Sequence, residues 1–81
     1  MEVLKIENDG SVTLDMNAGL YRYPSIISAS KKFSESFWVA VYGDREKNII
    51  INLKPKPGNG ADLEMLGLEF YNYALGLMQE S

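Results

Sequence analysis

The chain contains no cysteine and no histidine among its 81 residues. Without cysteine it has no disulfide, no thiolate nucleophile and no cysteine-ligated zinc or iron–sulfur site. Without histidine, a serine nucleophile has no imidazole to activate it. We therefore expect a protein that is not an enzyme and that has no cofactor, whether an iron–sulfur cluster, zinc or a flavin.

The chain also lacks a long apolar run and a concentration of positive charge. No stretch of about 18 apolar residues is present, and residues 1–5 do not have the basic start and apolar run of a secretory signal. Eight Lys and Arg are outnumbered by 11 Asp and Glu, for a net charge of −3. We expect no membrane partner and no nucleic-acid partner. We expect a cytoplasmic location, because small secreted domains usually carry disulfides.

The residues that are present suffice for one small packed domain. Apolar residues make up 46% of the chain, with five Tyr, three Phe and one Trp. This composition predicts a single α+β domain over residues 1–81. A chain of this length buries only about 60–65% of its unfolded surface, so association with a partner would add usefully to its stability.

Four segments have the character of β-strands. Residues 3–7 and 11–16 alternate apolar and polar side chains on either side of an Asn-Asp-Gly turn, which predicts a hairpin. Residues 37–42 and 48–54 are rich in aromatic and β-branched side chains and flank a polar Gly-Asp turn, which predicts a second hairpin. The Ile49–Ile51 triplet lacks clean alternation, as in a central strand that is partly covered on both sides.

Two segments have the character of helices. Pro24 and the apolar spacing after it predict a helix over about 24–36, and a second helix covers 62–78 with Asn59 or Asp62 as its cap. The order β-β-α-β-β-α predicts an α+β sandwich. Its four-stranded antiparallel sheet has strand order 1-2-4-3, with two helices on one face and the other face bare or used for contacts. The predicted core contains Ile26, Phe33, Ile49, Ile51, Leu53, Leu63, Leu66 and Phe70.

The last helix is apolar on two sides. Its first stripe faces the core and contains Leu63, Leu66, Phe70, Ala74 and Leu77. Its second stripe is centred about 120° away and contains Leu68, Tyr71, Leu75 and Met78. In a two-layer domain a helix buries one face, so we interpret the second stripe as a partner-binding surface for another protein or for a second copy. The alternative is a helix that packs deeper, with the loop over residues 17–23 covering this stripe.

Two further pairs of residues are candidates for partner binding. Trp38 and Tyr42 share strand parity, and if that parity faces outward they become interface anchors, because Trp and Tyr dominate binding hot spots. Lys54 and Lys56 flank two prolines in an extended stretch. They either contact an acidic peptide or belong to a plain linker, and the linker is slightly favoured.

Several segments of the chain resemble one family of small proteins. The segments are Leu20–Ile26 (LYRYPSI), Ile51–Lys56 (INLKPK) and the acidic helix start Asp62–Glu64. Together they resemble the HxsD-like proteins of His-Xaa-Ser peptide-modification systems, over about Val12 to Met78. Those proteins are encoded with two radical SAM enzymes and a repeat-rich precursor. The resemblance implies an accessory role in peptide maturation and carries over no catalytic residue.

We therefore expect a small non-catalytic accessory or adaptor protein that binds a protein or peptide partner, in radical SAM peptide maturation if the resemblance holds. The alternative is a self-associating, stand-alone domain that forms a homodimer. A small-ligand-binding protein or an enzyme comes third.

Overall fold

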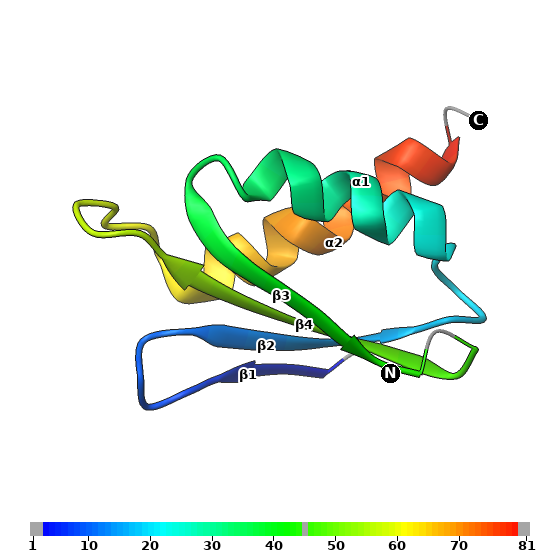
Figure 1. Ribbon diagram of the computed structural model, residues 1–81, viewed down its shortest axis with the longest axis horizontal. Helices are drawn as coiled ribbons and strands as arrows, with labels where there is room; N and C mark the ends of the chain where they lie inside the picture. The colour runs from blue at the N-terminus through cyan, green and yellow to red at the C-terminus, as the bar shows by residue number, and fades with distance from the viewer. Residues whose placement is uncertain (1–2, 45, 80–81) are drawn as a thin grey trace.

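The structure is a computed structural model that describes residues 3–44 and 46–79. Six elements follow one another along the chain (Figure 1). They are β1 (Val3–Ile6), β2 (Val12–Asn17), α1 (Tyr23–Phe33), β3 (Phe37–Gly43), β4 (Asn48–Pro55) and α2 (Leu63–Gln79). The predicted element order is confirmed, and α1 ends three residues earlier than predicted.

The sheet has the order β1-β2-β4-β3, and every neighbouring pair is antiparallel. The predicted order 1-2-4-3 is therefore confirmed. β4 is a central strand, as its Ile triplet predicted: Ile49 and Ile51 are buried on one face, and Ile50 is half-buried on the other. β2 and β3 each run antiparallel to β4, so they run parallel to one another and α1 connects them.

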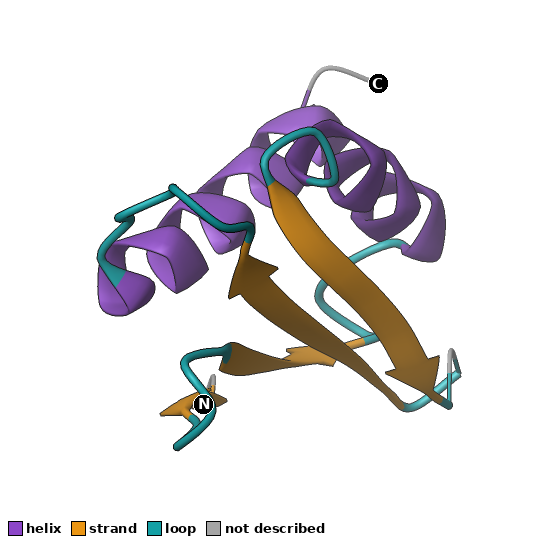
Figure 2. Cartoon of the chain, turned by 60° about the vertical axis from the view of Figure 1, so that its left-hand side comes forward, coloured by secondary structure: helices purple, strands orange, loops and turns teal. Residues whose placement is uncertain are grey.

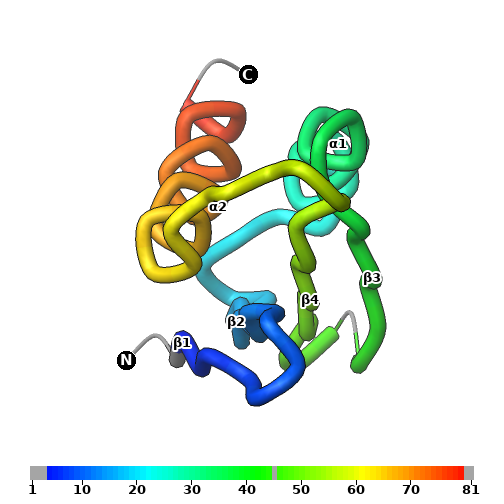
Figure 3. The backbone as a smooth tube through the Cα atoms, turned by 90° about the vertical axis from the view of Figure 1, so that its left-hand side faces the viewer, coloured from blue at the N-terminus to red at the C-terminus, as the bar shows by residue number. Residues whose placement is uncertain are grey.

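Both helices lie on the same face of the sheet (Figure 2). α2 contacts β1 and β2, and α1 contacts β3 and α2, as the view along the sheet shows (Figure 3). Period-2 alternation sends every second side chain of the strands towards these helices. The buried core consists of Val12, Leu14, Met16, Ile26, Ala29, Ile49, Ile51, Leu53, Leu66, Phe70, Tyr71 and Ala74. Phe33 and Leu63, predicted as core residues, lie half-buried at its margin.

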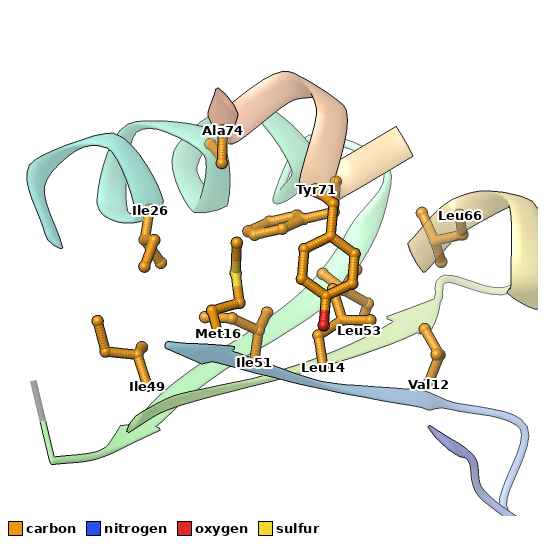
Figure 4. Close-up of a cluster of buried hydrophobic side chains, with 12 residues drawn as sticks. Val12, Leu14, Met16, Ile26, Ile49, Ile51, Leu53, Leu66, Tyr71 and Ala74 are labelled. Carbon is orange, nitrogen blue, oxygen red and sulfur yellow. The ribbon is translucent and has the colours of Figure 1, made fainter. Parts of the chain in front are cut away.

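Tyr71 belongs to this core, so its predicted role in partner binding is wrong. Only 6% of the residue is exposed, and its hydroxyl donates to the Asp15 carbonyl in β2 at 3.1 Å. Figure 4 shows its ring pointing from α2 down onto the sheet near Leu14. The Tyr21 ring packs against it with the centroids 5.8 Å apart. Its hydroxyl reaches the edge of the core while its ring fills the space beneath α2.

Met78, also predicted to face a partner, is half-buried beneath the loop that precedes α1. The Arg22 backbone N–H donates to the Met78 sulfur at 3.1 Å. Together with Tyr21, this contact shows that residues of the loop between β2 and α1 cover half of the second stripe of α2. The alternative of a deeper helix is thus right for Tyr71 and Met78.

Gly67 is the residue that lets α2 pack so deeply. A Cβ atom at this position would lie 2.5 Å from Leu4 Cδ1 and 3.0 Å from Leu14 Cδ2. The helix backbone therefore rests directly on side chains of β1 and β2. Gly76, nine residues further along and on the opposite side of the helix, has nothing within 4 Å of such a Cβ.

The two helix glycines provide a matched test of this close packing. Gly76→Ala should raise the free energy of unfolding by about 0.5–1 kcal/mol, because alanine is the better helix former and space is available. Gly67→Ala should lower it by about 1 kcal/mol or more, because Leu4 and the buried Leu14 must move. Urea unfolding measures both variants. Equal stabilisation by both substitutions would contradict the packing of α2 described here.

Candidate partner-binding surface

The outer face of the β3–β4 hairpin carries two exposed aromatic side chains. Alternation along β3 places Val39 and Val41 against the core and turns Trp38, Ala40 and Tyr42 outward. Trp38 is 57% exposed and Tyr42 is 54% exposed. The parity that the sequence left open is therefore the outward one, and no helix covers these rings.

Both predicted lysines lie beside Trp38. Lys54 is its direct partner across the β3–β4 ladder. The Lys56 ammonium nitrogen lies 4.8 Å from the centre of the Trp38 ring, a cation–π distance, and donates to the Ser34 carbonyl at 3.0 Å. β4 extends through Pro55, and the Lys56 backbone N–H donates to the Ser36 carbonyl while its ammonium donates to the Ser34 carbonyl. This stretch is therefore not the free linker favoured by the sequence. The structure thus brings Trp38, Tyr42, Lys54 and Lys56 onto one surface.

The β1–β2 half of the outer face is polar instead. The Asn52 amide donates to the hydroxyls of Ser11 and Thr13, each at 3.1 Å, and the Thr13 hydroxyl donates to the Glu7 carboxylate at 2.7 Å. The Ser11 hydroxyl donates to Asp9 at 2.6 Å and holds the pKa of that carboxyl below its ordinary value. These polar groups satisfy one another, whereas the exposed aromatic rings that the structure describes on the outer face are those of Trp38 and Tyr42 in β3.

β3 is also an edge strand, a feature that the sequence analysis did not use. Bonds at both ends of the hairpin define its ladder: the Lys56 N–H donates to Ser36 O at 3.4 Å, and the Asp44 N–H donates to Asn48 O at 3.0 Å. Ser36 and Asp44, the even-numbered residues that directly flank β3, are thus bonded to their partners in the register of the β3–β4 ladder. In an antiparallel ladder, bonded and non-bonded pairs alternate. The even-numbered residues therefore bond to β4 throughout.

The backbone groups of the odd-numbered residues Phe37, Val39 and Val41 point the other way, to the open side of β3. In the described sheet no strand lies beyond it. The sequence could have revealed this edge, because the predicted strand order places 37–42 outermost and the segment contains neither charge nor proline.

Two hollows lie along this edge, one at each end of β3. The first, of about 210 Å³, is lined by Lys32, Phe33, Glu35, Ser36 and Phe37. The second, of about 140 Å³, is lined by Tyr23, Val41, Tyr42, Gly43 and Ile49. Gly43 lines the second hollow with its backbone, since its φ is +99° and a Cβ there would lie 2.7 Å from the Asn48 carbonyl oxygen.

The rest of the second stripe of α2 is exposed but lies elsewhere. Leu68 is 44% exposed and Leu75 is 41% exposed, and Met65 at 54% extends the same side of the helix. α2 rests on β1 and β2 in the helical layer (Figure 3), so residues of α2 belong to the side of the sheet opposite the outer face that carries Trp38. The predicted partner-binding residues therefore form two separate surfaces, with Tyr71 and Met78 in neither.

In the part of the chain that the structure describes, no three His, Cys, Asp or Glu residues come together as a metal site would require. None of the described helices has the length and apolar character needed to cross a membrane. No protein-family model, curated protein or solved structure matches this chain. The resemblance to HxsD-like proteins stays a prediction.

The single tryptophan of the chain reports on the surface around it. Iodide should quench Trp38 fluorescence more strongly, relative to neutral acrylamide, than it quenches a free tryptophan amide, because Lys54 and Lys56 concentrate anions there. Added sodium chloride should reduce the excess. Replacing both lysines by Gln should abolish it, whereas Lys5→Gln should not. A ratio equal to that of the free amide would contradict a positive surface at Trp38.

Proposed function

We propose that this protein is a non-catalytic adaptor that binds a segment of a protein or peptide on the outer face of its β3–β4 hairpin. The observation that supports this most is the exposure of Trp38 and Tyr42 on outward positions of one strand, with only the small Ala40 between them on that face. Large aromatic side chains are the commonest hot-spot residues of interfaces. Here they stand on a strand that is already ordered, so binding costs little additional conformational entropy.

The spacing and charge of this surface define the partner. Trp38 and Tyr42 lie four residues apart along an extended strand, or roughly 13 Å, which suits two apolar side chains of an extended segment. Lys54 and Lys56 favour Asp or Glu close to the side chain that contacts Trp38. The partner segment is therefore extended, acidic and apolar at two positions. An acidic segment complements the positive charge of Lys54 and Lys56, although the chain as a whole has a net charge of −3.

The resemblance to HxsD-like proteins supplies candidates for this partner. In a radical SAM peptide-maturation system the segment would belong to the repeat-rich precursor or to one of the modifying enzymes. The adaptor would then present the precursor to the enzymes and carry out no chemistry itself. This assignment rests on the resemblance alone, whereas the binding surface rests on the described residues.

The proposal is tested with four synthetic peptides of equal length: an acidic one with two aromatic residues, its neutral and basic counterparts, and a His-Xaa-Ser repeat. Trp38 emission reports binding directly, and calorimetry is used for variants that lack Trp38. The acidic peptide should bind more tightly than the basic one, and the preference should shrink at high salt. Trp38→Ala should weaken its binding by about tenfold or more.

Charge reversal separates this surface from the rest of the molecule. Lys54→Glu with Lys56→Glu should weaken binding of the acidic peptide, whereas Lys47→Glu at the hairpin turn and Leu68→Ala on α2 should leave it unchanged. Equal binding of acidic and basic peptides, or full affinity of the Trp38→Ala protein, would overturn the proposal.

A further inference from the structure

We propose that the free edge of β3 pairs with β3 of a second copy of this chain, antiparallel, with Ala40 facing Ala40 on a two-fold axis. The two four-stranded sheets then become one continuous sheet. This inference goes beyond the proposed function, because it uses the edge of β3 and leaves the outer face open to a partner.

The composition of β3 is the first argument. Sheet edges in natural proteins are normally protected by short length, by lysine, by proline or by a bulge. β1, at the other edge, is four residues long and carries Lys5. β3 is seven residues long, Phe-Trp-Val-Ala-Val-Tyr-Gly, without charge or proline. Two copies therefore meet without like-charge repulsion along the strand, although each copy has a net charge of −3.

The hydrogen bonds limit the possible registers. The groups open for pairing belong to the odd-numbered residues Phe37, Val39 and Val41, so these must lie opposite odd-numbered residues of the second copy. A two-fold axis at Ala40 satisfies this condition. It pairs Val39 with Val41 and Phe37 with Gly43.

The hollow at Gly43 selects this register among those that parity allows. Phe37 of the second copy would lie directly opposite Gly43, where its ring can occupy the hollow of about 140 Å³ beside Tyr23. With the axis at Val39 instead, Phe37 would lie opposite Val41 and Gly43 would face no residue of β3. The two-fold symmetry makes the contact twice, once at each end of the paired strands.

The side chains of the outer face also fit a two-fold axis at Ala40. Trp38 of each copy would lie opposite Tyr42 of the other, and aromatic cross-strand pairs stabilise sheets. In the pairing between the two copies, Ala40 faces Ala40 as a non-hydrogen-bonded pair, because its backbone groups bond to β4. Opposite Cα atoms of such a pair lie only about 4.5 Å apart, so a small side chain fits best. Joined in this way, the two outer faces form one aromatic surface flanked by Lys54 and Lys56 of each copy.

Because the chain has no cysteine, a single introduced thiol reports this contact. Opposite Cα atoms at about 4.5 Å are within the range that a disulfide bridges. Under mild oxidation, Ala40→Cys should form a covalent dimer rapidly at concentrations where sedimentation shows the wild type to be dimeric. Leu75→Cys, on the exposed side of α2, is the control and should form it far more slowly.

A charge exchange tests the register without oxidation. Ala40→Glu and Ala40→Lys should each weaken self-association by about fivefold or more, since like charges would face one another on the axis. An equimolar mixture of the two variants should recover the dimer. Circular dichroism should show both variants folded, because the Ala40 side chain is exposed.

Two outcomes would overturn the inference. The first is a wild type that stays monomeric at every concentration. The second is a dimer that Leu68→Glu with Leu75→Glu dissociates and Ala40→Glu does not, which would place the contact on α2. Failure here leaves the peptide titrations unaffected, since those depend on Trp38 and the lysines; loss of peptide binding with an intact dimer would refute only the proposed function.

Discussion

The two helices cover only one face of the sheet, and this constraint determines which other surfaces of the molecule are left exposed. β2 and β3 are parallel with β4 between them, so the chain must cross the sheet through α1. α2 then lies beside α1 on the same face, over β1 and β2. All the helical cover is therefore on one side. The outer face and the outermost strand must therefore either carry groups that water can solvate or be covered by a binding partner.

The outer face meets this demand differently in its two halves. Over β1 and β2 it is hydrogen-bonded through Asn52, Thr13 and Glu7, which suits permanent exposure. Over β3 it presents Trp38 and Tyr42, and the edge itself has unpaired backbone groups. Exposed apolar surface of this kind marks interaction sites. In so small a domain, burying it by association also offsets a modest intrinsic stability.

The features of the fold that depend on local sequence were predictable. The Asn-Asp-Gly turn, the helix start at Asp62, whose carboxylate accepts the Met65 N–H at 3.1 Å, and the central Ile triplet all follow from short segments. How closely α2 packs on the sheet was not predictable, because it depends on the contact between Gly67 and Leu4, more than sixty positions apart in sequence. Periodicity gives the direction of Tyr71 around the helix axis but not the distance from that axis to the sheet.

The candidate surface was predictable only in part. Strand parity groups Trp38 with Tyr42, but an aromatic and β-branched strand does not show which face is inward until α1 is placed. The proximity of Lys56 to the Trp38 ring depends on a loop held by Ser34, which no sequence pattern indicates. Leu68 and Leu75 were assigned correctly to an exposed side of α2.

Amide hydrogen exchange along β3 tests the central claim, an open edge closed by a second copy, most directly. In dilute solution the amides of Trp38, Ala40 and Tyr42 should be protected by their bonds to β4, while those of Val39 and Val41 exchange fast. Raising the protein concentration should slow exchange at Val39 and Val41, and at Phe37 where it pairs with Gly43 of the second copy, but not at Trp38, Ala40 or Tyr42. Protection of the Val39 and Val41 amides equal to that of Trp38, Ala40 and Tyr42 at every dilution, or fast exchange that concentration does not change, would contradict the account.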